Sequence, residues 1–258
     1  MYEVDLQGKT GIVFGVANHR SIAWSVAEIL AQAGAKLAFT YQNDRLSSGV
    51  AKLAATVGDG PVLPCDVSDE EQIEHAINTA GKHFGGNLDI IIHSIAFANR
   101  EDLEQEFSRT SREGFRVALE ISAYSLLPIV RHALPLMRDG GSIVTMTFQA
   151  SQRVFPNYNV MGTAKAALEH EVRQLAAEVG PSNIRVNAIS AGPLDTLAAR
   201  GIHGFVDMRH AAAERSPLRR NITHDEVAKT ALYLCSNLSS GVTGAIIPVD
   251  SGYHIVGI

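Results

Sequence analysis

The sequence predicts an α/β fold: a doubly wound parallel sheet of about seven strands, with helices on both faces. Short, fully apolar runs alternate along the chain with longer segments whose apolar residues recur at helical spacing. This alternation is the pattern of successive strand–helix–strand units. The 258 residues contain no internal repeat, low-complexity run or linker, so we expect residues 1–258 to form a single domain.

Each predicted element corresponds to one apolar run or one helical pattern. Apolar runs predict strands at 9–14, 36–41, 62–65, 88–93, 142–147, 184–189 and 245–249. Helical spacing predicts helices at 22–33, 45–56, 70–84 and 112–137, another from residue 158 onward, and one at 224–235. The polar segment 100–112 is expected to be irregular or partly helical. The stretch that follows the loop 190–193 and runs to residue 221 is expected to be mobile.

Composition excludes several classes of function. Hydrophobic residues make up 46% of the chain and charged residues 19%, which suits a packed core. The net charge is -5 and both signs are mixed along the chain, so no nucleic-acid partner is expected. Cys65 and Cys235 lie in apolar runs, as packed thiols do, and we expect no metal site. Residues 1–6 carry acids, and no stretch reaches the length of a membrane span, so we expect a soluble, cytoplasmic protein.

The first strand runs through Gly15 into a helix that starts near Ile22. Free backbone N–H groups and the helix dipole at such a turn favour a phosphate group. Only one glycine of the usual three in a dinucleotide-binding turn is present, so a plain strand-to-helix turn capped by Ser21 is an equal alternative.

Polar or small residues follow each of the later strands. In a Rossmann-like fold the end of the second strand meets the adenosine ribose, and the neutral Gln42 there favours NAD, although Arg45 follows. Asp66 either caps the next turn or accepts a hydrogen bond from an adenine amino group. Carboxyl strand ends converge on one cleft, so this cleft is expected to contain Gly15, Gln42, Asp66, Ser94, Thr147 and residues 190–193.

A tyrosine and a lysine, Tyr158 and Lys165, lie seven positions apart at the start of the fifth helical pattern. Seven residues are two helical turns, so both side chains are expected on one helix face. A nearby ammonium lowers the pKa of a phenol, which makes the pair a candidate proton donor near neutral pH. By itself the pair matches many surface helices, and its position at the cleft favours catalysis.

With these motifs the chain resembles the short-chain dehydrogenase/reductase superfamily, and within it the bacterial enoyl-acyl carrier protein reductases. The resemblance covers essentially the whole chain. It rests on the segments 15–22, 39–44, 65–67, 93–98, 156–162 with Lys165, 185–193 and 196–199.

The resemblance implies that NADH reduces the trans-2 double bond of an enoyl thioester bound to acyl carrier protein, in fatty acid synthesis. Tyr158 would hydrogen-bond the enolate oxygen, and Lys165 would hold the nicotinamide ribose. Residues near 194–215, with Phe205 and Met208, would form a substrate lid; the alternative is an amphipathic surface helix. The helices near 118–133 and after 158 are apolar on more than one face, and the family forms homotetramers through such helices.

Site residues carried over from the family fall into two groups. Cofactor contacts are expected from Gly15, Ser21, Ile22, Gln42, Asp66, Val67, Ser94, Ile95, Lys165, Leu194, Thr196 and Ala198. Substrate contacts are expected from Ala98, Phe148, Tyr158, Met161, Phe205 and Met208.

Two residues depart from the family pattern. Phe148 stands ten positions before Tyr158, where the family usually has a second tyrosine. It keeps the ring and loses a hydrogen-bond donor, which we interpret as a change in pocket polarity. Asp195 stands where a basic or neutral residue is common, and an acid there weakens binding of a pyrophosphate.

Two rival functions remain open. A short-chain reductase of a ketone or alcohol uses a serine thirteen residues before its tyrosine, and Thr145 occupies that position here. A dinucleotide sensor without turnover is the third hypothesis, although a sensor has no need of a proton donor. NADH is the expected cofactor, with NADPH less favoured.

Overall fold

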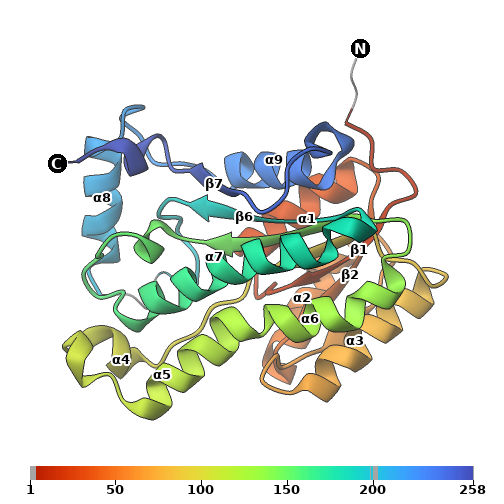
Figure 1. The fold of residues 1–258 in the computed structure, drawn as a ribbon, viewed down its shortest axis with the longest axis horizontal. Coiled ribbons are helices and arrows are strands. Elements are labelled where there is room, and N and C mark those ends of the chain that lie inside the picture. The colour runs from red at the N-terminus through yellow and green to blue at the C-terminus, as the bar shows by residue number, and fades with distance from the viewer. Residues whose placement is uncertain (1–3, 198, 200–202, 258) are drawn as a thin grey trace.

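The structure, a computed structural model, describes residues 4–197, 199 and 203–257. Its centre is a sheet of seven parallel strands in the order β3-β2-β1-β4-β5-β6-β7 (Figure 1). The strands are β1 (Thr10–Phe14), β2 (Lys36–Tyr41), β3 (Val62–Pro64), β4 (Ile90–His93), β5 (Gly141–Thr147), β6 (Ile184–Ala191) and β7 (Ile246–Val249). The predicted fold class is confirmed, and all seven strands lie where apolar runs predict them.

Helices connect the strands. They are α1 (Ile22–Gln32), α2 (Asp44–Ala54), α3 (Glu70–His83), α4 (Arg100–Glu104), α5 (Arg112–Leu119), α6 (Leu126–Ala133), α7 (Val160–Val179), α8 (Phe205–Arg215) and α9 (His224–Cys235). A π-helical turn, η2 (Glu120–Tyr124), joins α5 to α6. The segment 100–112, predicted to be irregular or partly helical, contains α4 and the short 3₁₀ turn η1 (Phe107–Arg109), which confirms the prediction.

Alternating side chains of the strands supply two separate cores. In β4, Ile90 and Ile92 pack on the side covered by α1, α2 and α9. Ile91, between them, packs on the side covered by α3, α6 and α7. Successive side chains of a strand point to opposite faces. A strand covered on both faces must therefore be apolar throughout, which is why the sequence shows continuous rather than alternating apolar runs.

The helical stretch Arg112–Leu136 corrects one expectation. It is 25 residues long and, by length and composition alone, could cross a membrane, whereas the sequence was expected to contain no such stretch. Half of its most apolar 18-residue part is buried inside the fold. Its α6 part supplies Leu126 and Ile129 to the core shared with α3 and α7, which is the packing of a helix layer on a sheet.

The strand order reverses between β1 and β4. From β1 the chain moves outward to β2 and β3, then returns to the other side of β1 as β4. Ligands of open parallel sheets bind at the carboxyl ends of the strands beside such a reversal. Residues that follow β1 and β4 therefore mark the centre of the candidate site.

Candidate active site

Gly15 lies against the end of β4 in a way that only glycine allows. Its φ is +100°, and a Cβ atom placed on it would lie 2.0 Å from the carbonyl oxygen of Ser94. The backbones that follow β1 and β4 thus touch at the switch point of the sheet. A flat or phosphate-bearing ligand meets backbone there rather than side chains.

Ser21 shapes the turn after β1 without capping the helix that follows. Its Oγ accepts hydrogen bonds from the N–H groups of Ala17 and Asn18, at 3.0 and 3.1 Å. It closes the turn, as the plain-turn alternative expects, but makes no hydrogen bond that caps α1; a phosphate contact at this turn stays a prediction. The imidazole Nε2 of His224 donates to the carbonyl of Arg20 at 3.0 Å and ties this turn to the start of α9.

The residues expected to meet the adenosine end lie at the ends of β2 and β3. Gln42 and Arg45 are both exposed. Asp66 caps its own turn, because its Oδ1 accepts from the N–H and the hydroxyl of Ser68 at 3.0 and 2.7 Å. Val67 is half-buried beside it. The turn-capping alternative for Asp66 is therefore correct, and a contact with adenine stays a prediction.

Tyr158 lies in the turn before α7, not on the helix. Its N–H donates to Phe155 O at 3.2 Å, its carbonyl accepts from Met161 N at 3.0 Å, and α7 begins at Val160. Asn159 has φ 34°, and its Nδ2 donates to Gln105 O at 2.6 Å. The expectation that both members of the pair share a helix face is thus wrong: only Lys165 belongs to the helix.

Lys165 is a buried ammonium held by backbone carbonyls. It is 4% exposed, and its Nζ donates to Met146 O at 2.9 Å and to Ile95 O at 3.5 Å. Burial lowers the pKa of Lys165 to about 8, and the nearby carboxylate of Glu169 partly opposes that change. Glu169 is itself buried and accepts from Thr147 Oγ1 at 2.9 Å.

The pKa of Tyr158 changes in the direction opposite to the one expected. Burial raises the pKa of its hydroxyl well above the ordinary value for a phenol. The phenol is therefore neutral near pH 7 and can donate a hydrogen bond, whereas a phenolate could only accept one.

Thr145 does not face the cleft. It is fully buried on β5, where its Oγ1 lies 2.7 Å from the Nδ1 of His93. The other ring nitrogen of His93, Nε2, lies 2.9 Å from Ser125 Oγ. The hydroxyl on which a ketone reductase would depend thus belongs to an interior hydrogen-bond chain.

Aromatic rings line the approach to Tyr158. The Phe148 ring contacts those of Tyr158 and Phe155, with centroid separations of 5.0 and 4.7 Å. Met161 is buried, with its sulfur 3.6 Å from Ser122 Oγ. Ala98 is half-buried in the segment that follows β4. Of these predicted substrate contacts, Phe148 and Met161 contact Tyr158 directly, through the ring pair and through the hydrogen bond from Met161 N to Tyr158 O.

The segment after β6 leads into α8, the predicted lid helix. Leu194 is buried, and Thr196 Oγ1 accepts from Ala199 N at 3.1 Å; Ala198 lies outside the described residues. On α8, Phe205 is buried and Met208 half-buried. A cavity of about 520 Å³ is lined by Asp195, Gly204, Phe205, Val206, Arg209, His210 and Asn221.

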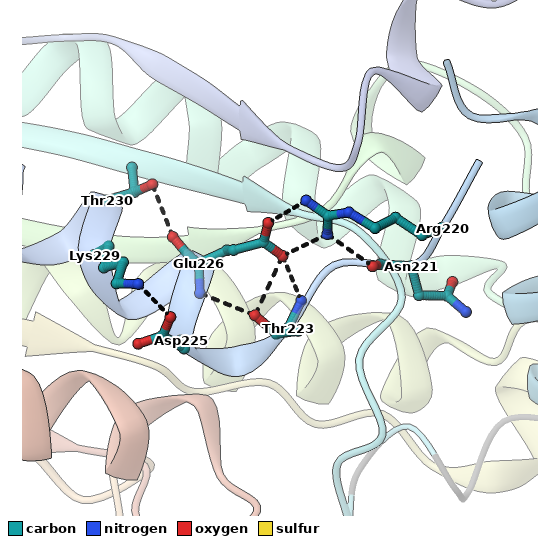
Figure 2. Close-up of polar contacts among 7 residues, drawn as sticks. All are labelled: Arg220, Asn221, Thr223, Asp225, Glu226, Lys229 and Thr230. Carbon is teal, nitrogen blue, oxygen red and sulfur yellow. Dashed lines mark hydrogen bonds and ion pairs between the residues drawn. The ribbon is translucent and has the colours of Figure 1, made fainter. Parts of the chain in front are cut away.

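The segments on either side of α8 are attached to the rest of the fold. Just before α8, Asn157 Nδ2 donates to His203 O at 2.9 Å, which links α8 to the turn that carries Tyr158. Figure 2 shows the segment after α8, where Arg220 pairs with Glu226 at 2.6 Å and Thr223 forms a capping box with the same carboxylate. The hydrogen bond from Arg220 lowers the pKa of Glu226 to about 2. The cap fixes where α9 begins.

Five residues to which the sequence assigns no role contribute to the site. They are His93, Ser122, Ser125, Asn159 and Glu169. His93 and Ser125 are fully buried polar side chains. The one available signal was a histidine and two serines inside otherwise apolar segments. Within the described part of the chain, no group of three or more His, Cys, Asp or Glu residues could hold a metal ion.

The seven-stranded parallel sheet, the glycine contact at its switch point, and the buried Lys165 ammonium seven residues after Tyr158 together define a short-chain dehydrogenase/reductase. Comparison with known proteins narrows the class. A family model described as enoyl-(acyl carrier protein) reductase matches residues 15–254. The chain belongs to this enoyl-(acyl carrier protein) reductase family.

Relatives match over the whole chain. The enoyl-[acyl-carrier-protein] reductase [NADH] of Bacillus cereus is 51% identical over 98% of this chain and 99% of its own length. The enoyl-[acyl-carrier-protein] reductase [NADPH] of Staphylococcus aureus is 49% identical, with the same coverage of each. A crystal structure of the Bacillus cereus reductase with NADP+ and indole naphthyridinone has a TM-score of 0.96 at 50% identity, and covers 98% of this chain and 99% of that one.

Proposed function

We propose that this chain is an NADH-dependent enoyl-acyl carrier protein reductase, which reduces the trans-2 double bond of enoyl thioesters in fatty acid synthesis. The observation that carries the proposal is a neutral phenol, Tyr158, in the turn before α7, together with a buried ammonium on that helix, Lys165, which the carbonyls of Ile95 and Met146 hold at the ends of β4 and β5. The family and the relatives named for this reaction support the same activity.

The residues at the switch point fit a dinucleotide. Gly15 and Ser94 are in backbone contact with no room for a Cβ on Gly15, so backbone rather than side chain is presented at this turn. Gly15, Ser21 and Ile22 would face the pyrophosphate, Gln42 and Asp66 the adenosine, and Ser94, Ile95, Leu194 and Thr196 the nicotinamide half. When bound, NADH supplies a hydride for the β-carbon of the substrate. The outcome is a thioester enolate that needs a hydrogen-bond donor.

Tyr158 would be that donor. Its ring lies 5.0 Å, centroid to centroid, from the apolar ring of Phe148. A neutral hydroxyl in such surroundings gains most from a hydrogen bond when the partner oxygen becomes charged. Such a bond is stronger in the transition state than in the ground state, so it accelerates the reaction rather than only binding substrate. Lys165 would hold the ribose hydroxyls and keep the local field positive.

A ketone or alcohol substrate is less compatible with this site. Thr145 would have to donate to the substrate oxygen, and its hydroxyl is 2.7 Å from His93 in the interior. An assay that offers a trans-2-enoyl thioester and a 3-oxoacyl thioester of equal chain length separates the two activities. NADH oxidation with the enoyl compound alone supports the proposal, and oxidation with the 3-oxo compound alone overturns it.

Residues 194–215 would close over the acyl group. Support comes from Phe205, which is buried on α8 and lines the cavity of about 520 Å³, and from the half-buried Met208 further along the same helix. We further propose that residues 1–258 work as one domain, because the strands of the single sheet run from residue 10 to residue 249. The two buried free thiols fit a cytoplasmic location.

We propose that the chain assembles as a homotetramer. A groove of about 590 Å³ between α5, η2 and α7 is lined in part by Phe115 and Tyr124, which are 41% and 45% exposed. Glu171 lines the same groove, and its buried Oε2 has no hydrogen-bond partner among the residues described. A second copy would cover the rings and supply a donor. Sedimentation of a monomer at micromolar concentration would count against this assembly.

A further inference from the structure

His93 is a fully buried polar residue to which the proposed reaction assigns no role. It ends β4, its exposure is 0%, and it bonds to β5 through Thr145 and to the helix layer through Ser125. Buried polar groups of this kind are costly unless every donor and acceptor is paired. Both ring nitrogens of His93 have a hydrogen-bond partner, and only one assignment of donors and acceptors is possible.

The assignment follows from Ser125. Its Oγ lies 2.7 Å from the carbonyl oxygen of Ile121, and two oxygens approach so closely only with a proton between them. The single hydroxyl proton of Ser125 is thereby used. His93 must then donate from Nε2 to Ser125 and accept at Nδ1 from the hydroxyl of Thr145.

The chain that runs from Thr145 through His93 and Ser125 ends on the π-helical turn η2. Ile121 and Ser122 both belong to this turn. Ser122 Oγ accepts from Phe97 N and donates to Phe97 O, each at 2.9 Å, and so holds the segment that follows β4. Residues three positions apart share one face of a helix, which is how Ser122 and Ser125 both reach inward.

The same strand ends supply both acceptors of Lys165. Met146 directly follows Thr145 on β5, and Ile95 comes two residues after His93 on β4. The register pairs His93 with Thr145. Any shift of these two strand ends relative to one another therefore changes the distances from Lys165 Nζ to its two carbonyls.

We propose that His93 is a positioning residue of the reaction: through Thr145 and Ser125 it fixes the ends of β4 and β5 so that their carbonyls hold the Lys165 ammonium in place. The inference rests on the proposed function, because Lys165 is given its task by that reaction.

The charge state of His93 is part of this role. Burial and the charge of Lys165 lower the pKa of His93 to about 3, so the ring is neutral throughout the working range of pH. With His93 neutral, no cation from the sheet side acts on Lys165 among the described residues. The charged group that acts on it is Glu169 on its own helix, whose carboxylate raises the pKa of the lysine. Carbonyl hydrogen bonds favour the charged form of the lysine further.

The test compares variants that each break one link of the hydrogen-bond chain from Thr145 through His93 to Ser125. In His93→Asn the amide oxygen can still accept from Thr145, and in His93→Gln the amide N–H can still donate to Ser125. Thr145→Val and Ser125→Ala remove one link each and leave the imidazole in place. Ile77→Ala, in α3 and fully buried on the same side of the sheet, is a control of general core damage.

Two readouts separate positioning from stability. The ¹³C shift of Lys165 Cε in the enzyme without cofactor reports the pKa of the lysine directly, and the alkaline limb of kcat/KM reports it through turnover. In each of the four variants of the hydrogen-bond chain we expect the pH midpoint of both titrations to fall by at least about 0.5 pH unit, and kcat to be about tenfold lower. Ile77→Ala should lower the melting temperature and move neither midpoint.

The proposal is overturned if the lysine midpoints of the folded chain variants equal those of the unchanged protein. It is also overturned if all four variants fail to fold while Ile77→Ala folds, because the chain then serves stability alone. Absence of enoyl reduction by the unchanged protein is a separate result: it overturns the proposed function, while the ¹³C titration still measures what His93 does to Lys165.

Discussion

The ring of Phe148 meets the ring of Tyr158 edge to face, with centroids 5.0 Å apart and planes at 63°. The Phe155 ring also packs on Phe148, with centroids 4.7 Å apart, and the Tyr253 ring lies 6.3 Å from that of Phe155. The C-terminal turn is thus connected to Tyr158 by a row of rings. In this row Phe148 is the neighbour of Tyr158 and carries no hydroxyl.

Phe148→Tyr should change selectivity more than stability. The added hydroxyl offers a second donor near the thioester carbonyl, and a hydrogen bond of this kind contributes about 1 kcal/mol, or about fivefold in rate. The apolar acyl pocket becomes more polar at the same time. We expect the kcat/KM ratio of a four-carbon to a twelve-carbon enoyl thioester to rise at least about threefold. A ratio that stays constant would show that residue 148 does not face the acyl group.

Lys165 should set the alkaline limb of the pH profile. Burial lowers its pKa to about 8, so the ammonium is present below that pH and is lost as the pH rises through it. The carboxylate of Glu169 raises the pKa of Lys165, and Glu169→Gln removes that charge while keeping an acceptor for Thr147. We expect a limb near pH 8 in kcat/KM for NADH, and a lower midpoint in the variant. A midpoint that rises would contradict the assigned electrostatics.

Gly15→Ala should damage cofactor binding. A side chain at φ +100° is strained by about 1–2 kcal/mol, and its Cβ would lie 2.0 Å from Ser94 O, so the turn must move. We expect KM for NADH to rise at least about tenfold. Gly49→Ala in α2, where a Cβ meets nothing within 4 Å, is the matched control and should leave the kinetics unchanged. Equal NADH affinity in both variants would remove the turn from the site.

NADH should be preferred over NADPH by at least about tenfold in kcat/KM, which corresponds to ~1.4 kcal/mol. Gln42 and Asp44 follow β2, and the carboxylate of Asp44 at the first turn of α2 repels a 2′-phosphate. Arg45 is exposed. Gln42→Arg should narrow the preference. Equal or better efficiency of the unchanged protein with NADPH would show that Arg45 turns inward.

Much of this fold is readable from the sequence, because a doubly covered sheet demands continuous apolar strands. All seven strands begin or end within two residues of their predicted bounds, as with β4 at Ile90–His93 against the predicted 88–93. The strand-end rule also brings Gly15 and Ser94 together correctly, since their backbones touch. Local pattern and global topology agree at these positions.

Other features depend on tertiary contacts that no local pattern contains. Periodicity extends the helix back to Tyr158, but the Asn159 side chain bonds to Gln105 O and its backbone leaves helical geometry. Whether a neighbouring ammonium or burial dominates the pKa of a phenol depends on the distance between the two groups, which the sequence does not give. At Tyr158 burial dominates and raises the pKa. The role of Thr145 depends on His93, 52 residues earlier in the chain.

The most direct test of the account is turnover of the Tyr158→Phe variant with NADH and a trans-2-enoyl thioester. Removing one donor to a developing oxyanion typically costs ~3 kcal/mol, or about a hundredfold in rate. We expect kcat to fall by about that factor while the Kd for NADH, measured by fluorescence titration, stays within about twofold. Lys165→Ala, by contrast, should weaken NADH binding as well. Full turnover of Tyr158→Phe would contradict the central claim that the Tyr158 hydroxyl stabilises the enolate.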